Sequence, residues 1–265
     1  MFVIAVANHK GGTGKTTTTH TLGHILAAER GLRTLLIDLD PQGSLTLACG
    51  VPREWAENHN VSHMLQRGKR ARSLGELAFQ VGPRCDLVPS HKEQLAECQR
   101  ELAVRMVGRD TALRMALRHQ ADAYSVVLVD CMPGFDILSI NALVAATHVL
   151  VPLKPTIMDI GGLGEFLDTL DVVEEMNPDL VRLGILVTFY HPQYNLHRQG
   201  LEMLGTSLHG FPVLQAKIGE SVKVAEAPGL GRTVVEHDGD NRRAEEYRAL
   251  ADEVLRLLGD GRGGT

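Results

Sequence analysis

The sequence predicts an α/β fold that is doubly wound, with a mainly parallel sheet flanked by helices. Three observations support this. Short β-branched apolar runs alternate with amphipathic stretches, which is the pattern of repeated βα units. Most of the runs are almost continuously apolar, as strands covered by helices on both faces should be. A glycine-rich loop follows the first run directly and leads into the first helical stretch.

Seven apolar runs are predicted as strands: residues 2–7, 34–39, 86–89, 125–130, 148–153, 183–189 and 212–218. Helices are predicted over residues 14–30, ending at Gly31, and over residues 162–176, stopped by Asn177 and Pro178. A last helix over residues 243–258 places an apolar stripe on one face, for which we expect core packing. Residues 52–84 form the least regular region.

The length and composition favour one soluble globular domain. The chain has 265 residues, 44% hydrophobic and 22% charged, so we expect a single domain over residues 1–258 and a flexible tail over residues 259–265. Neither an apolar run of membrane-spanning length nor a secretory signal is evident, which predicts a cytoplasmic protein. The net charge of -5 means that any nucleic-acid binding requires a local basic patch.

The loop between the first strand and the first helix predicts a phosphate-binding site. Its pattern is that of GxxxxGK[ST], although His9 stands at the first glycine position and Lys10 follows it. The glycines allow backbone amides to approach phosphates, Lys15 would lie against the β and γ phosphates, and the Thr16 hydroxyl would bind Mg²⁺. The predicted nucleotide-binding residues are Gly11, Gly12, Thr13, Gly14, Lys15, Thr16 and Thr17.

Three aspartates end strands at the edge of the sheet where this loop lies. Asp130 ends the run SVVLVD and takes the Walker B role of holding the metal. Asp38 and Asp40 end the strand after the first helix. One of these two should support Mg²⁺ and the other could orient the attacking water, because ligands of open α/β sheets bind at the carboxyl ends of the strands.

Four segments resemble the ParA/MinD family of deviant Walker A P-loop ATPases, and specifically its ParA (Soj) partition branch. They are KGGTGKTT at 10–17, LLIDLDPQGS at 35–44, VVLVDCMPG at 126–134 and EAPGLGRTVVEHD at 226–238. The resemblance implies an ATP- and Mg²⁺-dependent, partner-stimulated ATPase that forms a nucleotide-sandwich homodimer. It also implies that Lys10 is the signature lysine that reaches the phosphates of the other subunit. Asp40 is then required for hydrolysis, with Lys10 and Lys15 as the other catalytic residues, and Asp38 lies near the metal with Thr16 and Asp130.

The same resemblance implies nonspecific DNA binding on the nucleoid and a ParB-like or cargo-adaptor partner. The chain departs from the family pattern at two points: Gln193 stands where arginine is common, and Gly219-Glu220 replaces a usual Pro-Arg. Between residues 182 and 243 there are seven Lys/Arg and six Asp/Glu, so phosphate contacts should be weaker than in the family. The DNA-binding candidates are Arg198, Lys217, Lys223, Arg232, Arg242 and Arg243.

Several alternatives remain. A MinD-like membrane-associated ATPase needs a basic amphipathic C-terminal helix, whereas the polar face of residues 243–258 is mainly acidic. A ParA-like ATPase that positions a protein cargo on the nucleoid fits equally well, and an iron–sulfur reductase with the same loop is disfavoured by singly placed cysteines. The basic cluster at residues 67–72 is either a solvated loop or a DNA or partner contact. His20 and His24 are interpreted as helix-surface histidines, because no third metal ligand is suggested.

Overall fold

The protein is built around a central sheet whose strands have the burial expected from the sequence. The computed structural model describes residues 1–118, 123–207 and 210–260. The strands are β1 (Phe2–Val6), β2 (Thr34–Leu39), β3 (Phe79–Gly82), β4 (Cys85–Val88), β5 (Val126–Cys131), β6 (His148–Leu153), β7 (Val181–Tyr190) and β8 (Val213–Gly219). All seven predicted strands are present, with boundaries that differ by no more than two residues.

The strand order across the sheet is β3-β4-β2-β5-β1-β6-β7-β8. Every neighbouring pair is parallel except β3 with β4, which is antiparallel. β3 was not predicted from the sequence, and it lies within residues 52–84, the least regular region of the chain. Arg84 has φ of 59° and turns the chain back from β3 into β4. A four-residue edge strand followed by so tight a turn has too little apolar periodicity to be recognised.

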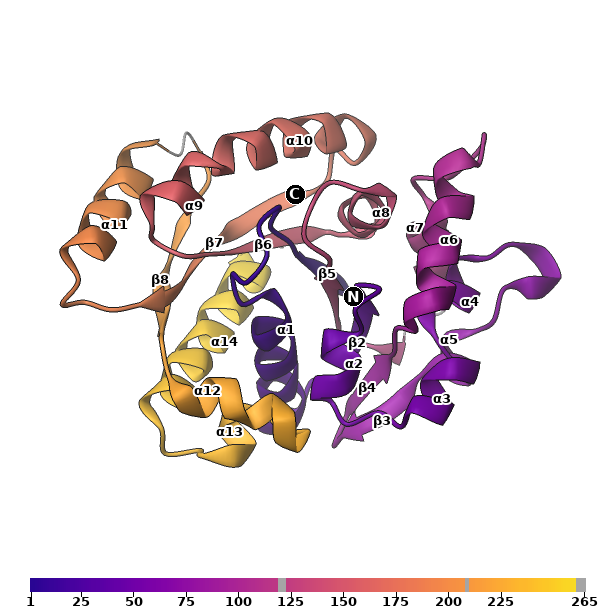
Figure 1. Ribbon diagram of the computed structural model, residues 1–265, viewed down its shortest axis with the longest axis horizontal. Helices are drawn as coiled ribbons and strands as arrows, with labels where there is room; N and C mark the ends of the chain where they lie inside the picture. Colours follow the sequence, from indigo (N-terminus) through magenta and orange to yellow (C-terminus); the bar gives the residue numbers. More distant parts are fainter. Residues whose placement is uncertain (119–122, 208–209, 261–265) are drawn as a thin grey trace.

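Helices cover both faces of the sheet (Figure 1). They are α1 (Lys15–His24), η1 (Ile25–Glu29), α2 (Ser44–Ala48), α3 (Arg53–Asn58), α4 (Val61–Leu65), η2 (Gly68–Arg70), α5 (Leu74–Leu77), α6 (Lys92–Val104), α7 (Ala112–Leu117), α8 (Ile137–Ala145), α9 (Ile157–Gly161), α10 (Leu163–Met176), α11 (Asn195–Ser207), α12 (Val222–Glu226), η4 (Ala227–Leu230), α13 (Val234–His237) and α14 (Arg242–Asp260).

The two faces of the sheet belong to two separate apolar clusters. Along β1, Val3 and Ala5 join the cluster that contains α6, α7, α8 and α10. Ile4 and Val6 join the cluster that contains α1 and α14. This alternation is the two-residue period of a strand, and burial on both sides explains why β1 is apolar throughout. The doubly wound α/β class predicted from the sequence is confirmed.

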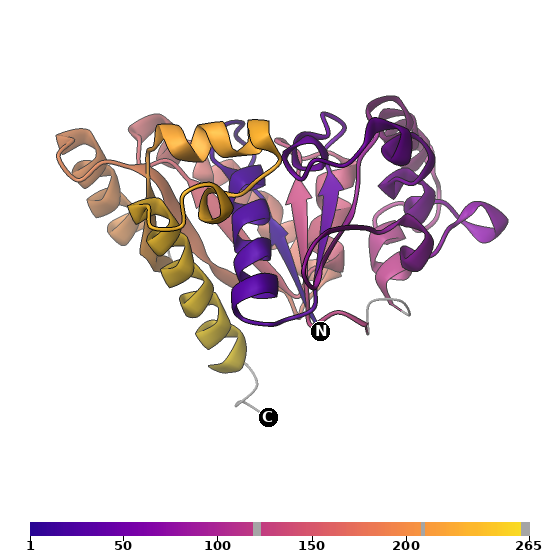
Figure 2. The same ribbon diagram turned by 90° about the horizontal axis from the view of Figure 1, so that it is seen from below.

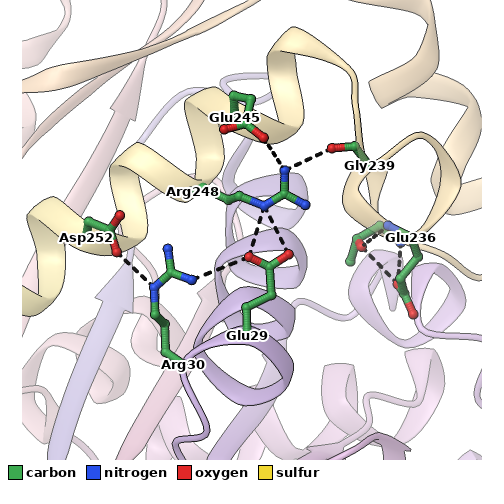
Figure 3. A network of polar contacts seen from close by, with 8 residues as sticks. Glu29, Arg30, Glu236, Gly239, Glu245, Arg248 and Asp252 are labelled. Atoms are coloured by element: carbon green, nitrogen blue, oxygen red, sulfur yellow. Dashed lines mark hydrogen bonds and ion pairs between the residues drawn. The ribbon is translucent and has the colours of Figure 1, made fainter.

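The first helix does not continue to residue 30 as a regular α-helix. The α-helix ends at His24, and Ile25–Glu29 form a π-helical turn. Its end is held to α14 by ion pairs: Arg248 Nε donates to both carboxylate oxygens of Glu29 at 3.0 and 2.9 Å, and Arg30 Nε donates to Asp252 at 2.8 Å (Figure 3). The network fixes the far end of the helix whose beginning forms the phosphate loop.

The last helix packs as expected from its apolar stripe. Tyr247, Leu250 and Val254 are buried against the cluster that contains α1, so the stripe belongs to the core. The helix runs to Asp260, two residues into the predicted tail, and the rest of that tail lies outside the described residues. Within the described part of the chain, no helix combines the length and apolarity that crossing a bilayer requires.

Parallel strands place their carboxyl ends at one edge of the sheet. Figure 2 shows this edge at the top, with the phosphate loop and α12 above the ends of the strands, while the N-terminus lies at the opposite edge. The residues predicted to bind nucleotide and metal therefore meet at one edge, as the sequence analysis expects.

Candidate nucleotide-binding site

The loop between β1 and α1 has the backbone geometry of an anion-binding turn. Gly12 and Gly14 have φ of 70° and 88°, in the left-handed region that favours glycine. Gly14 is the N-cap of α1 and no side chain caps this end, so the first amides of the helix point toward the loop without a side-chain acceptor. Such a helix start favours a phosphate through its amides and its dipole.

Two hydrogen bonds that the sequence did not predict hold this loop to neighbouring strands. The buried Asn8 side chain donates to the Pro152 carbonyl at 2.7 Å and accepts from the Lys10 amide at 3.0 Å. The Thr188 hydroxyl donates to the Thr13 carbonyl at 2.8 Å. The loop is therefore pinned to β6 and β7, and the position of Asn8 directly after an apolar strand is the only sequence signal for this role.

A cavity of about 410 Å³ opens beside the loop. The Thr13 side chain is buried and does not line it, whereas the other predicted nucleotide-binding residues do. The cavity is lined by Gly11, Gly12, Gly14, Lys15, Thr16, Thr17, His20, Thr21, Asp40, Ser44, Ala48, Pro133, Phe189, Val224, Pro228, Arg232, Thr233 and Val234. Its size suits a nucleotide-sized ligand.

Lys15 lies at the base of this cavity with only 6% of its surface exposed. Its Nζ donates to the Lys10 carbonyl at 2.8 Å, across the loop. Burial lowers the pKa of Lys15, and the negative charge of Asp130 opposes this effect. A buried ammonium with one carbonyl acceptor retains two donors for a phosphate oxygen.

Thr16 and Asp130 form a pair of oxygen ligands beside the loop. The Thr16 hydroxyl donates to Asp130 Oδ2 at 2.7 Å, and the Thr19 hydroxyl donates to Asp130 Oδ1 at 3.4 Å. Burial raises the pKa of Asp130, and the neighbouring charge of Asp38 adds to the effect. A hydroxyl and a carboxylate at the edge of a triphosphate-sized cavity are the hard oxygen ligands that Mg²⁺ prefers.

Asp38 lies directly opposite Asp130 in the β2–β5 register and is fully buried. Its Oδ2 accepts from the amide and the hydroxyl of Thr46 at 2.8 and 2.7 Å. Burial raises the pKa of this carboxyl to about 6. These contacts give Asp38 a structural role in holding α2 against β2, and its predicted place near the metal stays a prediction.

Asp40 is the acidic residue that lines the cavity. Its Oδ1 accepts from the Gln42 amide at 2.8 Å, and its carbonyl accepts from the Ser90 hydroxyl at 2.7 Å. Its backbone is thus held by the segment that follows β4, while its second carboxylate oxygen has no hydrogen-bond partner among the described residues. A partly exposed carboxylate in this position can orient a water molecule.

His9 replaces the first glycine of the usual motif. Its side chain is accommodated because Gly162 has no side chain to occupy the same space. Its ring stacks on Phe135 with centroids 5.9 Å apart. A Cβ atom at Gly162 would lie 2.7 Å from His9 Nε2 and 3.1 Å from Lys10 Cε. Gly162, at the start of α10, therefore provides the room that His9 and Lys10 occupy.

Lys10 extends away from the base of the loop toward α9. Its Nζ forms an ion pair with Asp159 at 3.5 Å and donates to the Met158 carbonyl. The neighbouring Met158 and Ile157 side chains are 81% and 53% exposed. Lys10 thus lies at an apolar surface beside the phosphate loop, and Asp159 was not singled out from the sequence.

Comparisons with known proteins agree with this geometry. A family model described as an AAA domain matches residues 1–182. The chain is 38% identical to the chromosome-partitioning ATPase Soj of Thermus thermophilus over 253 residues, covering 95% of this chain and 94% of the relative. It belongs to the ParA/MinD family of ATPases. The sporulation initiation inhibitor protein Soj of Bacillus subtilis is 33% identical, with 95% of this chain and 97% of the relative covered.

A solved structure carries the ligands that the site predicts. The structure of cobyrinic acid a,c-diamide synthase from Mycobacterium smegmatis with a bound ATP analog and magnesium has a TM-score of 0.84 and 32% identity. The match covers 98% of this chain and 97% of the other. ATP and Mg²⁺ are therefore the ligands of this ParA/MinD-family site, and ATP hydrolysis is its activity.

The DNA-binding candidates do not all lie on one surface of this family member. Arg232 lines the nucleotide cavity, although the sequence analysis grouped it with the DNA contacts. Arg243 is mostly buried, packs where a Gly219 Cβ would lie, and forms an ion pair with Glu246 at 3.0 Å. The remaining candidates are on elements around the β8 edge: Arg198 on α11, Lys217 on β8, Lys223 on α12 and Arg242 on α14.

The position of Arg232 predicts a contribution to ATP binding. Arg232→Ala should weaken ATP affinity roughly tenfold, because a guanidinium–phosphate hydrogen bond is worth about 1.5–3 kcal/mol. Titration with a fluorescent ATP analogue measures the effect. Arg242→Ala, which removes an arginine with a 77% exposed side chain outside the cavity, is the matched control. Equal affinities of the two variants would remove Arg232 from the nucleotide site.

His20 is buried rather than on the helix surface, so that prediction was wrong. It is 8% exposed and lines the nucleotide cavity, and His24 lies 3.5 Å from Glu236. The α12–α13 segment covers this face of α1, which sequence alone did not indicate. Among the described residues, no group of three or more His, Cys, Asp or Glu side chains is placed to hold a metal ion.

The buried His20 predicts a pH-dependent loss of stability. Burial lowers its pKa to about 4, so the unfolded chain binds the proton first as the pH falls. The resulting loss of unfolding free energy is absent above about pH 6.5, the pKa of a histidine in the unfolded chain. It grows to roughly 3 kcal/mol near pH 4. Urea unfolding from pH 7 to 4 should show a smaller loss for His20→Gln than for the wild type. Parallel losses would contradict this.

Proposed function

We propose that the chain is a dimerising ParA-type ATPase that binds DNA nonspecifically when ATP is bound and drives partition or positioning of DNA or cargo. The observation that carries the proposal is Lys10, a second lysine of the phosphate loop that extends toward an exposed apolar surface formed by Met158 and Ile157. An apolar surface beside a ligand site is typical of an interface. The chromosome-partitioning ATPase among its relatives supports this function.

ATP-dependent dimerisation follows from the charges at this surface. Lys10 is held by a partly exposed ion pair with Asp159, and such pairs contribute only about 0–1 kcal/mol. A triphosphate in the facing subunit would bind the lysine more strongly, through charge-assisted hydrogen bonds. The dimer would then depend on the γ-phosphate, and the second cation would stabilise the charge that develops during phosphoryl transfer.

Within one subunit, different residues would bind the phosphates, hold Mg²⁺ and orient the attacking water. Amides of the loop and Lys15 bind the phosphates, and Thr16 and Asp130 would hold Mg²⁺, which neutralises phosphate charge when bound. Asp40 lines the cavity and would orient the water that attacks the γ-phosphorus. Asp38 supports this edge of the site through its bonds to Thr46.

DNA binding is proposed for the surface around the β8 edge. Two of its cations are engaged with carboxylates: Lys223 with Glu226 at 3.7 Å, and Arg242 with Glu246 at 3.3 Å. Phosphates must displace these ion pairs, which are weak at an exposed surface. The resulting affinity should be modest, and its salt dependence should be flatter than with the full set of phosphate contacts, because the slope follows the number of counterions released.

The test is a gel shift with a nonspecific duplex, with and without ATP, across a KCl series. We expect ATP-dependent retention at low salt that is lost as salt increases. Arg198→Ala should weaken it, and Arg53→Ala, on α3 away from the β8 edge, should not. The absence of ATP-dependent retention even at the lowest salt would contradict the proposal.

The same cycle would serve a chromosome, a plasmid or a protein cargo, with a ParB-like or cargo-adaptor partner that stimulates hydrolysis on the nucleoid in the cytoplasm. A MinD-like membrane association is not favoured, because the apolar stripe of α14 is buried in the core.

A further inference from the structure

A second surface, which shares no residue with the lining of the nucleotide cavity, exposes several large apolar side chains. The end of α6 and the segment that follows it expose Val104, Met106 and Val107 by 81%, 98% and 72%, and α7 exposes Met115 by 56%. Surface apolar residues are common singly, but a group of four within a short segment indicates an interaction site. None of the four lines the nucleotide cavity.

A groove adjoins these side chains. A cavity of about 420 Å³ lies between the α4–η2 segment and α7, and its lining includes Met64, Arg67, Arg72, Ala112 and Met115. The Arg67 guanidinium also packs against the loop between α6 and α7, in the space that a side chain at Gly108 would occupy. The two segments, residues 66–72 and 104–118, thus form one surface, here named the arginine–methionine patch.

The arginine–methionine patch is strongly basic in an acidic chain. Its two segments contain eight basic residues and one acidic residue, Asp110, while the whole chain has a net charge of -5. The basic residues are Arg67, Lys69, Arg70, Arg72, Arg105, Arg109, Arg114 and Arg118.

Some of these cations have internal roles, and others do not. Arg114 donates to the Val144 and Met176 carbonyls, and Arg72 donates to the Asn58 carbonyl. Arg67 and Arg70 are exposed, and neither has a carboxylate within 4.0 Å among the described residues. The patch therefore retains positive charge available to a partner.

We propose that the arginine–methionine patch binds an acidic amphipathic segment of a partner protein. Its carboxylates would pair with Arg67 and Arg70, and its apolar side chains would enter the groove beside Met115. Arginine and methionine are among the side chains enriched in protein interfaces, and methionine adapts to varied apolar partners. An amphipathic helix in such a groove is a common recognition mode. DNA is the less suitable occupant, because its interfaces are more polar and would leave the four apolar side chains without apolar contacts.

The experiment uses fluorescein-labelled synthetic peptides and the full chain, followed by fluorescence anisotropy. The first peptide is a helix with leucines on one face and glutamates on the other. The second replaces its leucines with serines, and the third replaces its glutamates with lysines. A labelled nonspecific duplex is the fourth probe. We expect saturable binding of the first peptide and at least roughly tenfold weaker binding of the second and third.

Two surface substitutions locate the binding. Arg70→Glu and Met106→Ser should each weaken the first peptide roughly tenfold, as loss of an interface anchor does. Arg53→Glu and Val172→Ser, exposed on α3 and α10, are the matched controls and should bind normally. ATP hydrolysis should be unchanged in all four, which separates this test from the proposed partition function.

Three results would overturn the proposal: no saturable binding of the first peptide, equal binding of the serine peptide, or equal effects of patch and control variants. Loss of duplex binding in Arg70→Glu, with no effect of Met106→Ser on any probe, would assign the surface to nucleic acid instead.

Discussion

Lys15→Ala should reduce ATP affinity by about a hundredfold. The buried Nζ is the cation at the base of the cavity, and its removal eliminates charge-assisted bonds to phosphate worth about 1.5–3 kcal/mol each. The variant also leaves the Lys10 carbonyl without its 2.8 Å donor, so the loop loses part of its own support. Isothermal titration with ATP and Mg²⁺ measures the effect.

Lys217→Ala, which removes a lysine on β8 outside the cavity, is the control for this titration. Circular dichroism and thermal unfolding should show that both variants are folded. Unchanged ATP affinity of a folded Lys15→Ala protein would exclude the loop as the phosphate site.

Asp40→Ala should bind ATP normally and hydrolyse it at least about a hundredfold more slowly. Asp40 lines the cavity, but its side chain forms no hydrogen bond or ion pair with the phosphate loop among the described residues. Its loss should therefore leave ATP affinity unchanged. Positioned acid–base groups contribute about 10²–10⁴ to a rate. Single-turnover hydrolysis at saturating ATP separates the two effects.

The control for this measurement is Asp171→Ala, which removes a carboxylate with a 66% exposed side chain on α10. Its ion pair is with Arg182, away from the cavity. Turnover of Asp40→Ala at the wild-type rate would move the catalytic carboxylate elsewhere, and lost ATP affinity would make Asp40 a binding residue.

Much of the fold could be predicted because most strands are continuous apolar runs in the sequence. β2 and β6 have the predicted boundaries, since continuous apolar runs require burial on both sides. The antiparallel β3 and the π-helical end of the first helix could not be predicted. The strand β3 depends on a turn at Arg84. The π-helical end accompanies ion pairs between Glu29 and α14, which join residues more than 200 positions apart in the sequence.

In the candidate site, too, residues in local sequence patterns could be predicted, and residues placed by distant segments could not. The loop and the strand-end aspartates are local patterns, so the sequence predicts where they meet. Arg232, His20 and Asp159 depend on which distant segment folds over the phosphate loop, and no local pattern reports that. His20 shows this most clearly, because it is buried where the α12–α13 segment covers α1, and nothing near His20 in the sequence indicates that contact.

We expect ATP to join two copies of the chain through Lys10. Size-exclusion chromatography with light scattering measures it directly, using Asp40→Ala to prevent turnover. We predict the mass of two chains with ATP and Mg²⁺, the mass of one with ADP, and the mass of one with ATP when Lys10→Ala is added. A single mass under all three conditions would contradict ATP-dependent dimerisation through Lys10.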